Sequence, residues 1–205
     1  MSDTRRVEMV AILRGLEPAR AIETGAALVA AGFRIIEVPL NSPQPFESIK
    51  LLAAEHPDCL VGAGTVLTVL DVDHVRAAGG KLVVAPNCDP HVIRHAHGLG
   101  MRVMPGVATA TEAFAAIQAG ATELKLFPAS TYGPGHLRAL KSVLPKNVKV
   151  YPVGGIGSQD IASWLGSGAD GFGFGSELFK PAYTLAEVSS RAKGLMDALR
   201  AAASS

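Results

Sequence analysis

The sequence predicts an α/β fold, a (β/α)8 TIM barrel in which residues 1–205 form a single domain. Three observations support this. The chain of 205 residues is long enough for one sizeable core and short for two domains. It also repeats one unit, seen in LVAAGFRIIEVPL and IQAGATELKLFP: an alanine-rich helical stretch, a glycine near its end, and a short β-forming run. Glycine supplies the left-handed residue that ends a helix, and a buried parallel strand reads as a continuous apolar run.

The third observation is the number of repeats. Eight strand candidates alternate with eight amphipathic segments, which matches a barrel at the short end of its usual length. The expected strands are Met9–Leu13, Arg34–Val38, Leu60–Ala63, Leu82–Ala85, Arg102–Met104, Glu123–Phe127, Lys149–Val153 and Gly171–Phe174. The expected helices are Pro18–Ala31, Phe46–Glu55, Val69–Ala78, Pro90–Gly98, Thr111–Ala119, His136–Leu144, Gln159–Leu165 and Thr184–Leu199. An open, doubly wound sheet is the alternative.

Composition narrows the class of partner. A formal net charge of +1 provides no general field that would attract nucleic acid or an acidic membrane surface, so we expect small-molecule partners. The N-terminal stretch is charged where a signal peptide is apolar, and no run approaches the length of a membrane span. We therefore expect a soluble, cytoplasmic protein in which Cys59 and Cys88 are reduced thiols.

The carboxyl ends of the expected strands should carry the functional residues, because that face of a barrel holds the active site. One arginine, one glutamate and one lysine occur there, together with two glycine-rich turns. The strand-end residues are Arg14, Glu37, Thr65, Pro86 with Asn87, Pro105, Lys125, Gly154 with Gly155, and Gly175 with Ser176.

Lys125 stands alone in the otherwise apolar run LKLFP, which Glu123 precedes. Burial lowers the pKa of an amine, so that a useful fraction is neutral and nucleophilic near pH 7. A neutral lysine attacks a ketone to form a Schiff base, which then acts as an electron sink for breaking a neighbouring C–C bond. The alternative is a structural lysine that reaches solvent or pairs with Glu123 or Glu37.

Glu37 ends the apolar run FRIIE and precedes Val38-Pro39. A half-desolvated carboxylate near a lysine can move protons through a water molecule. It could equally be a structural partner of Arg14 or Lys125, and the expected convergence of the pair at one barrel mouth favours catalysis.

The turns VGGIGSQD and GFGFGSELF follow the last two expected strands. Exposed backbone amides in such turns can surround an anion, and the corresponding loops of TIM barrels often hold phosphate. These turns predict a phosphorylated substrate, although glycines also serve simply to make tight turns.

Several motif matches are not functional in this interpretation. GSGADG fits a dinucleotide-binding pattern, but it precedes a strand where that motif follows one. His91 and His95 are expected on an outer helix facing solvent, and Asp71 and Asp73 near a helix start, where acids favour the helix dipole. We expect neither a metal nor any other cofactor.

Read in order, eight segments resemble the 2-keto-3-deoxy-6-phosphogluconate and -galactonate aldolases: AILRG, IIEVPLNSP, GAGTV, VAPN, MPGV, ELKLFPA, PVGGI and GFGFGSELF. The resemblance runs from about Val10 to the last helix. It implies a metal-free class I aldolase that cleaves a phosphorylated 2-keto-3-deoxy sugar acid to pyruvate and D-glyceraldehyde 3-phosphate. It also implies a homotrimer.

The resemblance assigns roles to the strand-end residues. Lys125 would form the Schiff base, and Glu37 would be the acid/base acting through a water. Arg14 and Thr65 would hold the pyruvate carboxylate, while Pro86 and Phe127 would line the methyl group. Phosphate would be bound by Gly154, Gly155 and Ser176.

Two positions bear on the choice between the C4 epimers. Gluconate-specific members resemble one another in an arginine within EVTLRT and a threonine within PTGGI, where this chain has Asn41 and Val153. A hydroxyl near C4 can favour one epimer, and valine removes it. We expect 2-dehydro-3-deoxy-6-phosphogalactonate as substrate, in galactonate and galactose catabolism by the De Ley–Doudoroff pathway, with the gluconate epimer as the alternative.

Two other classes of function are open at this point. A metal-free sugar-phosphate isomerase or decarboxylase barrel would use Lys125 as an electrostatic clamp. A binding protein would keep the phosphate turns and form no covalent adduct.

Overall fold

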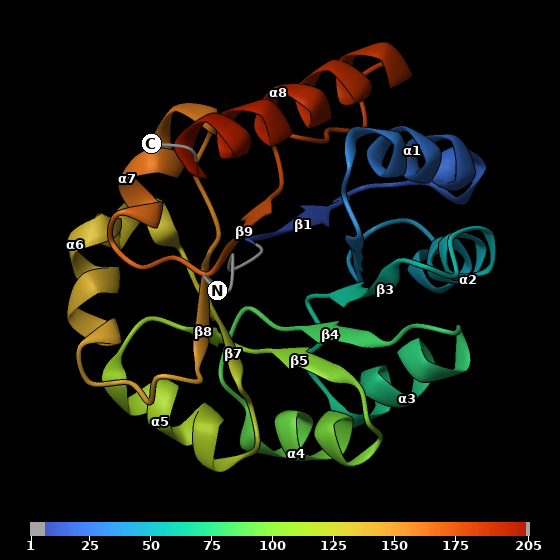
Figure 1. Ribbon diagram of the computed structural model, residues 1–205. Helices are drawn as coiled ribbons and strands as arrows, with labels where there is room; N and C mark the ends of the chain where they lie inside the picture. Colours follow the sequence, from blue (N-terminus) through green and yellow to red (C-terminus); the bar gives the residue numbers. More distant parts are fainter. Residues whose placement is uncertain (1–6, 204–205) are drawn as a thin grey trace.

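The computed structural model describes residues 7–203, so residues 1–6 and 204–205 of the predicted domain lie outside the described residues. It confirms the predicted barrel: short parallel strands form the centre, and the helices surround them in chain order (Figure 1). The strands are β1 (Glu8–Ile12), β2 (Ile35–Pro39), β3 (Leu60–Gly64), β4 (Leu82–Val84), β5 (Arg102–Met104), β6 (Gly106–Val107), β7 (Glu123–Leu126), β8 (Lys149–Pro152) and β9 (Gly171–Phe174).

The helices are α1 (Pro18–Ala31), α2 (Pro45–Glu55), α3 (Val69–Ala77), α4 (Pro90–Gly98), α5 (Ala110–Gln118), α6 (Ala129–Lys141), α7 (Ile161–Leu165) and α8 (Leu185–Ala203), with a 3-10 turn η1 (Ser158–Asp160) before α7. Among the described residues, no helix is both long and apolar enough to cross a membrane. Cys59 and Cys88 carry free thiols.

The barrel wall consists of two parallel sheets. One has the order β5-β4-β3-β2-β1-β9 and the other β6-β7-β8. An isolated bridge between Val153 and Gly173 connects β8 to β9, and Pro105 separates β5 from β6. The fifth expected strand is thus two short strands: β5 pairs with β4, and β6 pairs with β7.

Helix boundaries follow local chemistry. Thr68 and Asp71 form a reciprocal capping box at the start of α3, as Thr109 and Glu112 do at the start of α5. Gly32, at φ 113°, ends α1 in the left-handed conformation. Asp71 is therefore a helix-start acid as predicted.

The largest boundary error concerns α6, which was expected only from His136. It begins at Ala129 and contains a kink at Gly133, whose φ is 76° and which precedes Pro134. Because a glycine followed by a proline is typical of a helix boundary, the sequence pattern concealed the first turn.

The barrel interior has an apolar middle layer between two polar ends. This layer consists of inward-facing side chains from five strands and the bridge residue: Val10, Ile12, Ile35, Leu82, Val84, Met104, Tyr151 and Val153. Between the sheet and the helices lies a second, larger apolar layer.

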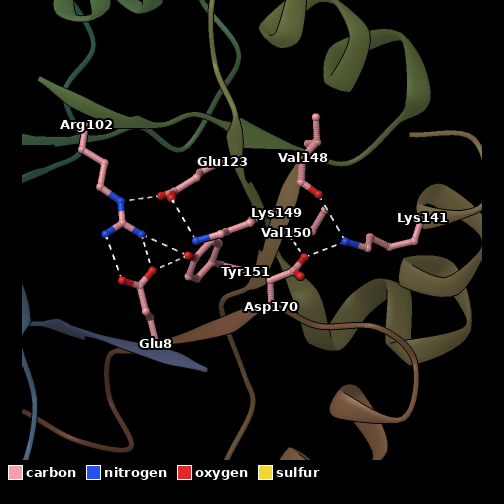
Figure 2. A network of polar contacts seen from close by, with 9 residues as sticks. All are labelled: Glu8, Arg102, Glu123, Lys141, Val148, Lys149, Val150, Tyr151 and Asp170. Carbon is pink, nitrogen blue, oxygen red and sulfur yellow. Dashed lines mark hydrogen bonds and ion pairs between the residues drawn. The ribbon is translucent and has the colours of Figure 1, made fainter. Parts of the chain in front are cut away.

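An ion network closes the base of the barrel, at the amino ends of the strands (Figure 2). Arg102 pairs with Glu123 through Nε and with Glu8 through Nη2, each at 2.5 Å. The Tyr151 hydroxyl donates to Glu8 at 2.6 Å. Burial opposes ionisation of Glu8, but the hydrogen bonds from Arg102 and Tyr151 outweigh it and lower the pKa of Glu8. Glu123 thus belongs to the base, and Lys149 is its second partner at 3.9 Å.

Beside this network, β8 is tied to the loop before β9 and to helix α6. The Val150 amide donates to Asp170 at 2.8 Å, and Lys141 Nζ pairs with the same carboxylate at 2.6 Å (Figure 2).

Candidate active site

The two titratable groups expected to do the chemistry lie at the opposite end of the barrel from the ion network. Lys125 comes from the centre of β7 and Glu37 from the centre of β2, and their residues are 6% and 1% exposed. Within residues 7–203, Lys125 makes no hydrogen bond or ion pair with Glu37 or Glu123. The structural alternative of a lysine paired with a glutamate is therefore wrong.

Burial determines the protonation of Lys125. It lowers the pKa of the amine, the Glu37 charge opposes this, and the Arg14 charge adds to it. The Phe127 ring lies next to the amine, with 4.8 Å between Nζ and the ring centroid. An amine with a lowered pKa beside an aromatic wall is suited to nucleophilic attack on a carbonyl.

The pKa of Glu37 is shifted in the opposite direction to that of Lys125. Burial raises the pKa of its carboxyl to about 7, against the opposing charges of Lys125 and Arg14. Within the described part of the chain, its Oε2 atom has no hydrogen-bond partner. The carboxyl fits only because residue 64 is glycine: a Cβ at Gly64 would stand 2.5 Å from Glu37 Oε1 and closer still to Oε2. A carboxyl with a pKa about 7 can both take up and release a proton near neutral pH.

The loops after β1 and β2 are joined at the barrel mouth by two hydrogen bonds. Arg14 Nη1 donates to Asn41 Oδ1 at 2.5 Å, and the Gly15 amide donates to Ser42 Oγ at 2.9 Å. Residue patterns pointed to Arg14 but contained no signal for these contacts, because they join loops 27 residues apart in sequence.

The turns after β8 and β9 form the remaining wall. Gly154 and Gly155 have φ values of 98° and 70°, which strongly favour glycine. Gly154 also packs on Phe127, since a Cβ there would stand 3.1 Å from the ring. Among residues 7–203, no hydrogen-bond acceptor faces the backbone amides of Gly155 and Ser176. Free amides of this kind provide an anion site.

One cavity is lined by seven of the predicted site residues, together with residues next to them in the chain or on the same strands. Its lining comes from the ends of β1, β7, β8 and β9: Ile12, Arg14, Lys125, Phe127, Val153, Gly154, Gly155, Ile156, Gly173, Gly175, Ser176 and Glu177. Ile12, Ile156, Gly173 and Glu177 were not predicted; inward alternation along β1 and β9 could have identified Ile12 and Gly173.

Three predicted site residues do not line this cavity. Glu37 is buried in the barrel, and Thr65 and Pro86 follow β3 and β4 on another part of the mouth. Thr65 adopts a φ of 56°, and Pro86 is half-buried. His95 lies on a solvent-facing helix surface, as expected, and pairs there across helices with Asp73 at 2.7 Å.

The fold and the residues at the barrel mouth together define a barrel enzyme with a buried amine, a buried carboxyl and glycine-rich turns that can bind an anion. This arrangement is suited to a lysine-dependent lyase. The model of the aldolase family described as KDPG and KHG aldolase matches residues 1–192. The chain belongs to this family and is an aldolase.

Similar proteins agree with this membership. The chain is 43% identical over 198 residues to 2-dehydro-3-deoxy-6-phosphogalactonate aldolase of Escherichia coli K12, covering 96% of this chain and 97% of that one. It is 47% identical over 185 residues to a probable 2-dehydro-3-deoxy-6-phosphogalactonate aldolase of Rhizobium meliloti, covering 90% and 87%. A solved structure described as native KDPGal matches with a TM-score of 0.95 at 42% identity, covering 98% of both chains.

Proposed function

We propose that this protein is a class I aldolase that cleaves 2-dehydro-3-deoxy-6-phospho-D-galactonate to pyruvate and D-glyceraldehyde 3-phosphate. The observation that carries the proposal is the burial of Lys125 and Glu37 in one barrel, with the pKa of the amine lowered and that of the carboxyl raised. Opposite shifts of this kind prepare one group to attack and the other to exchange protons.

The first half of the reaction forms the Schiff base. The neutral Lys125 amine adds to the C2 ketone, giving a carbinolamine, and loss of water gives the protonated imine. Glu37 supplies the proton that leaves with the hydroxyl group. The low exposure of both side chains keeps them in these protonation states until the ketone arrives.

The second half breaks the C3–C4 bond. Glu37, acting through a water molecule, accepts the proton of the C4 hydroxyl as C4 becomes the aldehyde carbon of glyceraldehyde 3-phosphate. The bonding electrons move to C3 and are held as an enamine by the imine nitrogen. Protonation of C3 and hydrolysis of the imine release pyruvate and restore the free amine.

The remaining site residues orient the substrate. Arg14 and Thr65 bind the carboxylate, and a guanidinium suits this role because it can donate two hydrogen bonds to one carboxylate. Pro86 and Phe127 line the pyruvyl methyl group. Gly154, Gly155 and Ser176 bind the phosphate through the turns after β8 and β9, where free amides face the cavity.

Val153 carries the epimer assignment. Its side chain lines the cavity without a hydroxyl that could bind one configuration at C4. The names of the two curated relatives, both galactonate aldolases, support the same epimer. We extend the proposal to a homotrimeric, cytoplasmic enzyme of galactonate catabolism, with residues 1–205 as one domain.

Trapping tests the chemistry. Incubation with pyruvate and borohydride should add one reduced pyruvyl group, visible in the intact mass and mapped to Lys125. The same treatment of Lys125→Ala should add none. A folded wild-type protein that binds phosphate ligands but forms no adduct would contradict the aldolase and favour an isomerase, a decarboxylase or a binding protein.

Comparison of the two C4 epimers tests the substrate. The ratio of kcat/KM should favour the galactonate epimer, and a clear preference for the gluconate epimer would show that the substrate assignment is wrong.

A further inference from the structure

Arg14 occupies a position from which it could serve either charged end of the proposed substrate. It follows β1, which lies between β2 and β9 in the larger sheet. On the β9 side it shares a cavity with Gly155 and Ser176, the proposed phosphate residues. On the β2 side, its Nη1 atom donates to Asn41. A substrate that carries both a carboxylate and a phosphate needs this cation to be held toward one of them.

The hydrogen bond to Asn41 determines toward which side of the mouth the Arg14 guanidinium is held. A guanidinium has only donors, so the carbonyl oxygen of the Asn41 amide must face it. The backbone under Arg14 is held as well, because the Gly15 amide donates to Ser42, whose residue is 7% exposed. Neighbouring residues of one loop thus hold both the side chain of Arg14 and the backbone beside it.

We propose that Asn41 is a positioning residue that holds the Arg14 guanidinium on the β2 side of the mouth, where it binds the substrate carboxylate and not the phosphate. The inference rests on the proposed aldolase function. It also explains how an exposed arginine, with several rotatable bonds, reaches one carboxylate reproducibly: part of its conformational freedom is lost before the substrate binds.

The reverse, aldol-forming reaction separates the two anions, because pyruvate carries the carboxylate and glyceraldehyde 3-phosphate carries the phosphate. For Asn41→Ala we expect the KM for pyruvate to rise about tenfold, the scale of losing a charge-assisted hydrogen bond that positions a binding group. The KM for glyceraldehyde 3-phosphate should stay within about twofold of the wild type, or fall if the released Arg14 turns toward the phosphate.

Three further variants make the test specific. Asn147→Ala is the matched control, because Asn147 is also exposed but precedes β8 at the base of the barrel; it should leave both KM values unchanged. Asn41→Gln keeps the acceptor and should recover most of the affinity for pyruvate. In an Arg14→Ala background, Asn41→Ala should cause no further loss, because the group that it positions is gone.

The outcomes separate the two proposals. An unchanged KM for pyruvate in Asn41→Ala, or an equal rise in both KM values, would overturn the positioning role while leaving the aldolase intact. A further loss in the Arg14→Ala background would do the same. A wild-type protein that forms no aldol product from the two substrates would refute the aldolase, and the positioning role with it.

Discussion

Replacing Gly64 by alanine should disable Glu37 without unfolding the barrel. Gly64 ends β3 and has no positive φ, so alanine introduces no backbone strain. The new methyl group would stand 2.5 Å from Glu37 Oε1, whereas an ordinary contact is about 3.4 Å. The carboxyl must therefore move by roughly 1 Å, and misplacement of a reacting group on that scale costs about a hundredfold in rate.

The assay is steady-state cleavage of the galactonate substrate, with thermal unfolding measured in parallel. We expect kcat to fall about a hundredfold while the protein remains folded. Gly194→Ala is the control, since nothing lies within 4 Å of a Cβ at that position on α8. It should leave kcat unchanged and stabilise the helix by about 1 kcal/mol.

A folded Gly64→Ala enzyme with wild-type kcat would show that the position of the Glu37 carboxyl does not limit the reaction. Loss of activity together with a large loss of stability would leave the reason ambiguous, and the residual affinity for phosphate ligands resolves it: an intact phosphate site shows that the barrel is still formed.

Three other predictions concern ionisation and specificity. Because burial raises the pKa of Glu37 to about 7, the folded state holds this proton more tightly than the unfolded chain. The contribution of this group to the free energy of unfolding is thus complete below about pH 4.5 and is lost as the pH rises through 7. Between pH 5 and pH 8 the wild type should therefore lose about 3 kcal/mol of stability relative to Glu37→Gln. The loss is measured as a fall in the Tm of the wild type relative to that of the variant. Arg102→Met should lower the free energy of unfolding, measured in urea, by about 3 kcal/mol, because Glu8 and Glu123 lose the cation between them. Arg200→Met, at an exposed pair with Asp197, is the control and should lower it by under about 1 kcal/mol. Equal losses would contradict the importance of the base network. Val153→Thr should shift the ratio of kcat/KM for the two epimers toward the gluconate form by about tenfold, and an unchanged ratio would remove Val153 from the specificity argument.

The strands were predictable because they read as short apolar runs and because β2, β4, β5, β7 and β9 each follow a helix that ends near glycine. The break at Pro105 was not, because it depends on which neighbour each half of the strand meets when the barrel closes. β5 pairs with β4, but the Pro105 carbonyl accepts from the Lys125 amide in the other sheet. No periodicity along one strand contains that information.

The site was predictable to the extent that barrels place function at the carboxyl ends of strands. That rule selected Lys125, Glu37 and Arg14. It could not reveal that Gly64 makes room for the Glu37 carboxyl, or that Asn41 accepts a hydrogen bond from Arg14, because both are contacts between strands or loops distant in sequence. Glu123, the partner of Lys125 in the structural alternative, stands two residues earlier on β7 and pairs with Arg102 and Lys149 at the base of the barrel.

The division of the wall into two sheets means that the nucleophile and its acid/base belong to different hydrogen-bonded bodies: Lys125 to the sheet of β6, β7 and β8, and Glu37 to the sheet of the other six strands. The two sheets meet at Pro105, whose carbonyl accepts from the Lys125 amide, at the bridge between Val153 and Gly173, and where the Asp170 amide donates to the Val150 carbonyl. A change in the spacing of the two sheets at these seams would therefore change the separation of the catalytic pair. Amide hydrogen exchange at the seams is accordingly a measure of how often the enzyme holds its reactive geometry.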